Sequence, residues 1–195
     1  MSLSEIAEAV APLVAEFQRL RVEYYLGGSV ASSTHGLPRA TLDVDLVAGL
    51  AAEHVKPLVA ALQSSYYIDA GMILDAIARE ACFNLIYLKT SFKVDVFVAK
   101  TREYDRVALQ RKQTKALDLE NPGSQFFFAS AEDVILSKLE WFRLGDEVSD
   151  AQWRDVIGVL KVQEATLDRS YLRKWATELA VADLLDKAWR EAEVP

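Results

Sequence analysis

Residues 41–47 of the chain read Thr-Leu-Asp-Val-Asp-Leu-Val. Polar and apolar residues alternate with a period of two, which predicts a β-strand. Asp43 and Asp45 then point to the same face, because side chains two apart on a strand do so. Two neighbouring carboxylates repel each other, and a divalent cation resolves the repulsion, since their hard oxygen atoms suit Mg²⁺ or Mn²⁺. The alternative is an exposed strand face that happens to carry two acids.

A third acid lies in the middle of an apolar segment. Residues 92–98 read Phe-Lys-Val-Asp-Val-Phe-Val and predict another strand. Its three valines share one face, and Lys93, Asp95 and Phe97 share the other. If this strand pairs with residues 41–47, Asp95 completes a cluster of three carboxylates. The alternative is a half-exposed strand with Lys93 and Asp95 on its solvent-facing side.

Gly27-Gly28-Ser29 follows a predicted strand at residues 22–26 and precedes a short predicted helix at residues 29–36. Glycine lets a backbone approach a ligand closely. Free N–H groups at a helix N-terminus bind phosphate, and Ser29 adds a hydroxyl donor. An ordinary strand-to-helix turn is the alternative. The glycine patterns of Rossmann folds and P-loops do not fit this segment.

The order of these segments resembles the nucleotidyltransferase superfamily related to DNA polymerase β. The shared pattern is a strand, Gly-Gly-Ser, a short helix, Asp-x-Asp on the next strand, and a distant Asp on a third strand. Thirteen residues separate Ser29 from Asp43, which is the usual spacing in this superfamily. The resemblance covers residues 22–98 and implies an α/β nucleotidyltransferase fold, with a mixed β-sheet flanked by helices.

The resemblance also implies an activity and a set of site residues. Such an enzyme moves a nucleoside monophosphate from an NTP to an acceptor hydroxyl, with two divalent metals neutralising charge during in-line phosphoryl transfer. The glycine–serine turn of the superfamily holds the triphosphate, which assigns nucleotide contacts to Gly27, Gly28 and Ser29. The three carboxylates hold Mg²⁺ or Mn²⁺, which assigns metal binding and catalysis to Asp43, Asp45 and Asp95.

The loop before the paired acids adds Arg39 and Thr41 as candidates for nucleotide binding. The guanidinium of Arg39 can pair with a phosphate or with Asp43. A purely structural ion pair is the alternative for Arg39. His35 has no second histidine near it in the sequence, so we do not expect it to bind a metal.

The character of the sequence changes after Ser130. Ser130 followed by Glu132 and Asp133 predicts the start of a helix. Apolar periodicity predicts four helices from there on, at residues 131–144, 150–163, 168–179 and 181–192. We therefore expect an α/β domain at residues 1–130 and a helical C-terminal region at residues 131–195 that packs on the site.

The helical region carries a second resemblance, to the C-terminal part of the AbiEii-type toxin nucleotidyltransferases. Residues 131–139 resemble the segment E-D-[apolar]₂-x-K-L of that group, with one residue more between Asp133 and Lys138, and residues 153–157 match part of its R-D-x-x-D-[apolar] segment. By position, the resemblance implies that Lys138 binds the phosphates of the nucleotide and that Asp155 orients Lys138 or assists the incoming hydroxyl. A plain salt bridge between helices is the alternative. Gly158 departs from the pattern, because a second acid often stands there.

Composition narrows the classes of partner. The net charge is −7, from 22 Lys and Arg against 29 Asp and Glu, which argues against tight non-specific binding to a nucleic-acid backbone. The N-terminus lacks the basic segment of a signal peptide, and no run approaches the roughly 20 apolar residues of a membrane span. From these features we expect a cytoplasmic protein with no membrane partner.

Several functions remain open at the level of sequence. The acceptor of an active enzyme can be tRNA, a protein or a small molecule such as an aminoglycoside, and the acidic balance favours a cationic small molecule over bulk RNA. The helical resemblance favours the toxin of a toxin–antitoxin pair, with an antitoxin as its partner. The alternative from another class is a non-catalytic nucleotide-binding or interaction module that has kept the fold.

Overall fold

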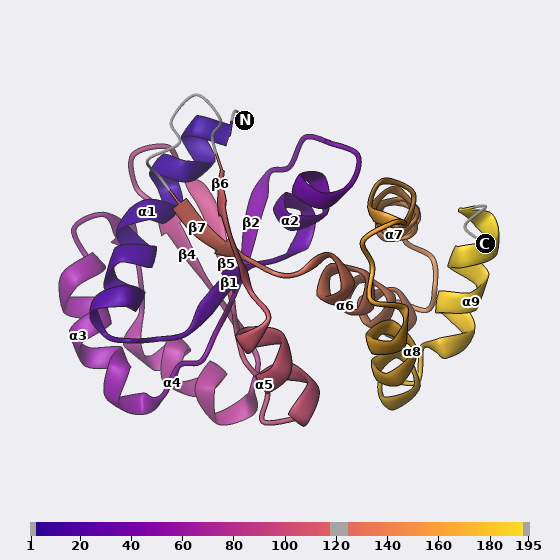
Figure 1. Ribbon diagram of the computed structural model, residues 1–195. Coiled ribbons are helices and arrows are strands. Elements are labelled where there is room, and N and C mark those ends of the chain that lie inside the picture. Colours follow the sequence, from indigo (N-terminus) through magenta and orange to yellow (C-terminus); the bar gives the residue numbers. More distant parts are fainter. Residues whose placement is uncertain (1–2, 118–124, 193–195) are drawn as a thin grey trace. The chain divides into compact units, whose positions relative to one another are not determined.

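The computed structural model describes residues 3–117 and 125–192, and Figure 1 shows its helices and strands. The chain divides into two compact units. The first comprises Met1–Gly27 and Ala40–Phe128, and the second comprises Gly28–Arg39 and Ala129–Pro195. The sequence placed residues 28–39 in the α/β part, whereas the structure groups them with the C-terminal helices.

The first unit is built on a mixed sheet of seven strands in the order β3-β4-β5-β2-β1-β7-β6. Strand β2 runs parallel to β5, and β1 runs parallel to β7, while the other neighbouring strands are antiparallel. The strands are β1 (Tyr24–Leu26), β2 (Asp43–Ala48), β3 (Tyr66–Tyr67), β4 (Cys82–Tyr87), β5 (Phe92–Val98), β6 (Gln113–Ala116) and β7 (Gln125–Phe128). The helices of this unit are α1 (Leu3–Arg19), α3 (Ala52–Leu62), α4 (Ala70–Arg79) and α5 (Glu103–Gln110).

Helices α1, α3 and α4 form a layer on one side of this sheet (Figure 1). Helix α1 buries an apolar stripe with helical spacing, formed by Ile6, Val10, Leu13, Val14 and Phe17. Alternate residues of β2 and β5 are fully buried, and they are Val44, Leu46, Val94 and Val96. The residues between them are only half-buried, so they lie on the opposite face of the sheet.

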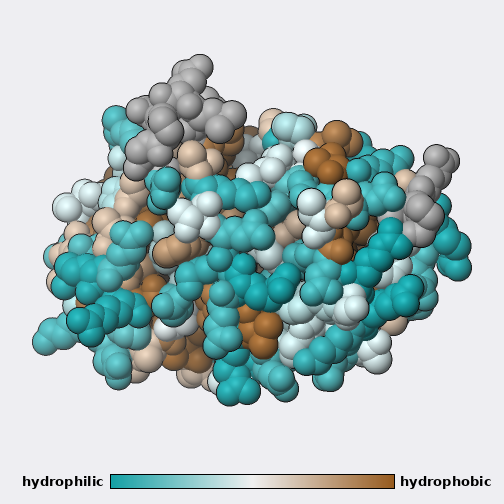
Figure 2. Space-filling model, in the orientation of Figure 1, coloured by the Kyte–Doolittle hydropathy of each residue, from teal (hydrophilic) through white to brown (hydrophobic). Residues whose placement is uncertain are grey.

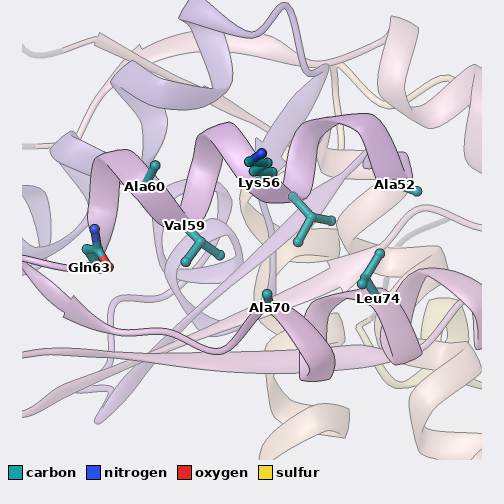
Figure 3. Close-up of a pocket in the computed structure, with 8 residues that line it drawn as sticks. Ala52, Lys56, Val59, Ala60, Gln63, Ala70 and Leu74 are labelled. Atoms are coloured by element: carbon teal, nitrogen blue, oxygen red, sulfur yellow. The ribbon is translucent and has the colours of Figure 1, made fainter.

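A shallow hollow of about 390 Å³ lies between α3 and α4 (Figure 3). It is lined by small and apolar side chains together with two polar residues, and the lining residues are Ala52, Val55, Lys56, Val59, Ala60, Gln63, Ala70 and Leu74. The lining includes no acid, and the hollow belongs to the helical layer. It therefore does not match the metal chemistry that the sequence predicts.

The second unit consists of helices. They are α2 (Gly28–His35), α6 (Ala131–Leu144), α7 (Asp150–Gln163), α8 (Arg169–Glu178) and α9 (Ala182–Glu191). Helix α6 packs on α7 and α8, α2 packs on α6 and α7, and α9 packs on α7 and α8. Ser130 caps α6 as predicted, because its hydroxyl accepts a hydrogen bond from the Asp133 N–H at 3.1 Å.

Two glycines let α2 and the loop after it approach α7. A Cβ atom on Gly36 would lie 2.8 Å from the backbone nitrogen of Val159 and 2.9 Å from the carbonyl carbon of Gly158. A Cβ atom on Gly158 would lie 3.4 Å from the backbone nitrogen of Leu37. Backbone atoms cannot turn aside as the end of a side chain can. The contacts at Gly36 are shorter than a Cβ atom tolerates, whereas those at Gly158 are ordinary van der Waals distances.

The strands predicted at residues 22–26, 41–47 and 92–98 and the helices predicted at residues 29–36 and after Ser130 are present, with ends that differ by at most two residues. Strands β4 and β5 form a hairpin, which the short segment Lys89-Thr90-Ser91 between two strand-like segments also indicates. Strands β6 and β7 form a second hairpin. The sequence Asn121-Pro122-Gly123 is typical of a turn, and it lies outside the described residues.

Within the described residues, no helix combines the length and apolarity that crossing a membrane requires. Figure 2 shows a face that is mostly hydrophilic, with small areas of hydrophobic residues. Large exposed apolar side chains are distributed along the chain, from Leu3 on α1 to Val162 on α7, as is usual for a folded domain.

Replacing Gly36 by alanine is expected to lower the free energy of unfolding by about 1–3 kcal/mol, because the new methyl group meets backbone atoms of α7. Urea denaturation monitored by tryptophan fluorescence measures the change. Gly49→Ala is the matched control, since a Cβ atom there meets its nearest neighbour, the carbonyl oxygen of Glu23, at an ordinary 3.7 Å. Equal stability of both variants would contradict the close approach.

Candidate active site

Three acids share one face of the sheet in the first unit. The parallel pairing of β2 with β5 places Asp45 directly beside Asp95, and Asp43 beside Lys93. Neighbouring strands lie about 4.8 Å apart, so carboxylates at paired positions are within reach of one ion. The side chain of Asp95 is 14% exposed and that of Asp43 is 39% exposed. The strand pairing on which the sequence prediction depended is therefore present.

Lys93 supplies a positive charge within this acidic face. Its Nζ lies 2.6 Å from Oδ2 of Asp95 and 3.9 Å from Oδ2 of Asp43. The hydrogen bond to Asp95 is the largest of the effects that raise the pKa of Lys93 above its ordinary value. The sequence placed Lys93 on the same side as Asp95 but assigned it no part in the site. The signal was present in the two-residue spacing of Lys93 and Asp95.

The acid face offers the oxygen atoms that Mg²⁺ and Mn²⁺ prefer, from Asp43, Asp45 and Asp95. Among the described residues, however, no group of three or more acidic, histidine or cysteine side chains is gathered around a single point. In this arrangement the ammonium of Lys93 is the cation that Asp95 and Asp43 share. The carboxylates therefore fit a divalent metal in their chemistry, provided that the Lys93 side chain turns away.

Backbone and hydroxyl contacts hold the start of β2 in place. The Thr41 hydroxyl lies 3.0 Å from both the backbone oxygen and Oδ1 of Asp43. The N–H of Gly27 donates a hydrogen bond of 2.8 Å to the backbone oxygen of Asp45. The first residue of the glycine–serine turn is thus fixed to the strand that carries two of the acids. Thr41 positions Asp43, a contact that the sequence did not specify.

The next strand extends the polar row beyond the acids. Asn84 on β4 pairs with Asp95 on β5, and its side chain is exposed. Cys82 lies on the same face of β4. Although Cys82 is exposed as a residue, partial loss of water around its thiol, and then the charges of Asp95 and Asp45, raise the pKa of that thiol, which stays protonated at neutral pH. Neither residue was predicted to belong to the site.

A second cluster lies wholly within the helical unit. Asp155 on α7 accepts hydrogen bonds from Nε of Arg39 at 2.8 Å and from Nη2 of Arg39 at 3.0 Å. Lys138 on α6 lies 2.9 Å from Oδ2 of the same carboxylate. Arg39 also donates a hydrogen bond to the hydroxyl of Ser29 on α2. The structure therefore joins four of the predicted residues, and it pairs Arg39 with Asp155.

Asp155 and Lys138 are deeply buried, with side chains that are 6% and 10% exposed, whereas Arg39 is 37% exposed. Burial raises the pKa of Asp155, but hydrogen bonds from Arg39 and Lys138 outweigh it and hold the pKa below its ordinary value. Two cations around one carboxylate leave an excess positive charge. Because the arginine is partly exposed, this cluster can bind an anionic group such as a phosphate.

The turn at the start of α2 has the predicted glycine geometry. Gly28 has a φ of +53°, in the left-handed region that favours glycine. His35, at the other end of α2, is buried, and its Nε2 lies 2.8 Å from the backbone oxygen of Ala129.

No protein-family profile matches the sequence, and no curated protein matches it. Solved structures do. ANT(2'')-Ia in complex with adenylyl-2''-tobramycin matches with a TM-score of 0.57 at 11% sequence identity, over 90% of this chain and 97% of that chain. An antigenic nucleotidyltransferase-like protein from Paracoccidioides brasiliensis matches with a TM-score of 0.53 at 16% identity, over 93% of this chain and 91% of that chain.

The chain has the nucleotidyltransferase fold. The fold prediction made from Gly27-Gly28-Ser29 and the acids on the strands is thereby confirmed. The more specific likeness to AbiEii-type toxins stays a prediction.

Replacing Asp155 by asparagine is expected to lower the free energy of unfolding by about 2–4 kcal/mol, because the buried ammonium of Lys138 loses its counter-charge. Urea denaturation at pH 7 provides the measurement. The control is Asp183→Asn, which removes a carboxylate that also pairs with an arginine but is 69% exposed. A much smaller loss is expected there, since exposed pairs contribute little.

Comparing wild type with Asp155→Asn also tests whether the folded protein lowers the pKa of the carboxyl group of Asp155. Its pKa is lower in the folded state than the ordinary value of 3.8, so the unfolded chain takes up the proton first as pH falls. The stabilisation is fully present above pH 3.8 and is lost as pH falls through the folded-state pKa. The difference in unfolding free energy between wild type and Asp155→Asn should therefore shrink below pH 3.8. A difference that stays constant there would show that the folded protein does not lower the pKa of Asp155.

Proposed function

We propose that this protein transfers a nucleoside monophosphate from an NTP to an acceptor hydroxyl, with the help of Mg²⁺ or Mn²⁺. One observation carries the proposal. Asp43 and Asp45 on β2 share a sheet face with Asp95 on β5, and Asp45 lies directly beside Asp95. Acids clustered on one face repel each other, and this arrangement suits a protein that takes up divalent cations with its substrate.

In the proposed reaction the acceptor oxygen attacks the α-phosphorus of the NTP. The bond from that phosphorus to the oxygen bridging to the β-phosphate breaks, and pyrophosphate leaves. Asp43, Asp45 and Asp95 would hold the divalent metals, which would supply neutralisation of the charge on the attacking and leaving oxygens. The carboxylate of Asp95 would also help to remove the proton of the acceptor hydroxyl.

The cationic cluster of the helical unit suits the phosphates of the nucleotide. Arg39 presents a partly exposed guanidinium, and Lys138 adds an ammonium held by Asp155. Gly27, Gly28 and Ser29 contribute backbone N–H groups and a hydroxyl at the start of α2. In this proposal Asp155 positions both cations, because it accepts hydrogen bonds from Arg39 and pairs with Lys138.

A small cationic molecule is the acceptor that we propose first. The net charge of −7 disfavours an RNA backbone and favours a positively charged substrate. ANT(2'')-Ia, which shares the fold, is described in complex with adenylyl-2''-tobramycin. The tRNA and protein acceptors, the toxin function and the antitoxin partner rest on the sequence resemblance around Lys138 and Asp155, and they stay predictions.

The second candidate function is a non-catalytic nucleotide-binding module. The contacts of Lys93 favour it, since its ammonium pairs with Asp95 and Asp43 in place of a metal. Calorimetry separates the two candidates. Binding of an NTP with Mg²⁺, without release of pyrophosphate or labelling of any acceptor over hours, would support the binding module.

Asp95→Asn is expected to reduce nucleotidyl transfer by on the order of a hundredfold, because the neutral amide binds a divalent cation weakly and takes no proton. The assay follows label from each of the four α-³²P-labelled NTPs into tRNA, protein and aminoglycosides, with Mg²⁺ or Mn²⁺. Asp75→Asn is the control, since it removes an exposed acid of α4 that pairs with Arg79. Undiminished transfer by Asp95→Asn would sink the proposal.

Arg39→Met is expected to weaken the binding of NTP by about tenfold, because a charge-assisted hydrogen bond to phosphate is lost. Isothermal titration calorimetry in Ca²⁺, which slows turnover, measures the dissociation constant. The control is Arg19→Met, which removes an exposed arginine of α1 that pairs with Glu16. If Arg39→Met bound NTP as tightly as wild type, Arg39 would be only a structural partner of Asp155.

A further inference from the structure

The strongest unexplained contact on the acid face is that of Lys93. Its Nζ lies 2.6 Å from Asp95 and 3.9 Å from Asp43, between two of the three proposed metal ligands. A structural ion pair would need only one acid. Here the lysine lies on β5 two residues before Asp95 and is paired in register with Asp43 on β2, so the base of its side chain starts between these two acids.

We infer that Lys93 is an internal cation that competes with the divalent metal for Asp95 and Asp43. This inference rests on the proposed function, because it concerns the same metal site. The ammonium leaves the two carboxylates when a metal is taken up together with the nucleotide. The phosphates of the nucleotide then offer the displaced ammonium a new partner. Lys93 thereby makes metal binding weak in the absence of nucleotide and strong in its presence.

The properties of the side chain allow this exchange. A lysine carries a compact charge on a flexible stem of four carbons, and 44% of the Lys93 side chain is exposed, so its ammonium can leave without unpacking the sheet. Three carboxylates and one ammonium still leave two negative charges on the face. A divalent metal is therefore attracted, but it has to replace an existing ion pair. Without that pair the metal should bind more tightly by about three- to tenfold, the equivalent of a partly exposed ion pair.

The exchange also predicts coupling between the two ligands. If the nucleotide removes Lys93 from the acids, it strengthens metal binding both through its own phosphate oxygens and by relieving the competition. By linkage, the metal strengthens nucleotide binding by the same factor. Removing the charge of Lys93 should leave the contribution of the phosphate oxygens and abolish the contribution from relieved competition. The factor by which the nucleotide strengthens metal binding should then fall three- to tenfold. This is the same factor by which the affinity for the metal alone improves.

The test titrates the full-length protein with Mn²⁺ and measures free Mn²⁺ by electron paramagnetic resonance, alone and with α,β-methylene-ATP. Lys93→Met and Lys93→Gln remove the charge, and Lys93→Arg keeps it. Lys89→Met is the matched control, because it removes the same charge from the turn of the same hairpin, where Lys89 pairs with Glu8. Thermal melting shows which variants are folded, and either neutral variant suffices.

Without nucleotide, the neutral variants should bind Mn²⁺ three- to tenfold more tightly than wild type, while Lys93→Arg and Lys89→Met stay within about twofold of it. In the neutral variants, α,β-methylene-ATP should also strengthen the binding of Mn²⁺ by a correspondingly smaller factor. Wild-type affinity in both neutral variants, with binding abolished by Asp95→Asn, would overturn the inference and leave the metal site standing. An absence of Mn²⁺ binding in every protein, with and without the analogue, would instead remove the proposed function and this inference with it.

Discussion

The parallel pairing of β2 with β5 is the constraint on which the candidate site depends. Fully buried Val44 and Leu46 lie beside Val94 and Val96 and hold the register, since exposing each of these side chains would cost about 1.5–3 kcal/mol. A shift of this register by one residue would exchange the two faces of one strand. Its acidic side chains would then be buried among those apolar residues. The hydrophobic face of the sheet thus determines that the acids meet on the other face.

The two clusters have the same arrangement of charges with opposite signs. In each, an ion pair with a charge of opposite sign reduces the repulsion between like charges. On the sheet, the carboxylates of Asp43 and Asp95 pair with the ammonium of Lys93 and leave excess negative charge. Among the helices, Arg39 and Lys138 surround the single carboxylate of Asp155 and leave excess positive charge. Each cluster is stabilised by its internal counter-ion and still attracts a ligand of the opposite charge. A metal cation suits the first cluster, and a phosphate suits the second.

The likeness to nucleotidyltransferase structures at 11% and 16% identity shows how little of a sequence a fold requires. Alternating strands, apolar helix faces and a glycine turn are enough, because many apolar side chains can fill the same core. Gly158 illustrates the limit of reading residues by pattern alone. It departs from the toxin-like pattern, and in the structure it lies in contact with the loop that follows α2, a neighbour that the pattern does not indicate.

Local patterns in the sequence by themselves determined the order and type of the elements, the shared face of Asp43 and Asp45, and the turn at Gly28, because alternation, periodicity and backbone freedom are properties of neighbouring residues. They also placed Asp95 and Lys93 on one face of a strand. Only the tertiary structure decided that this strand lies beside β2, that Arg39 reaches Asp155, and that α2 packs on α7. Those outcomes depend on contacts between residues far apart in the chain. The spacing of residues along the sequence does not indicate which of several apolar faces, or which charged side chains, will come into contact.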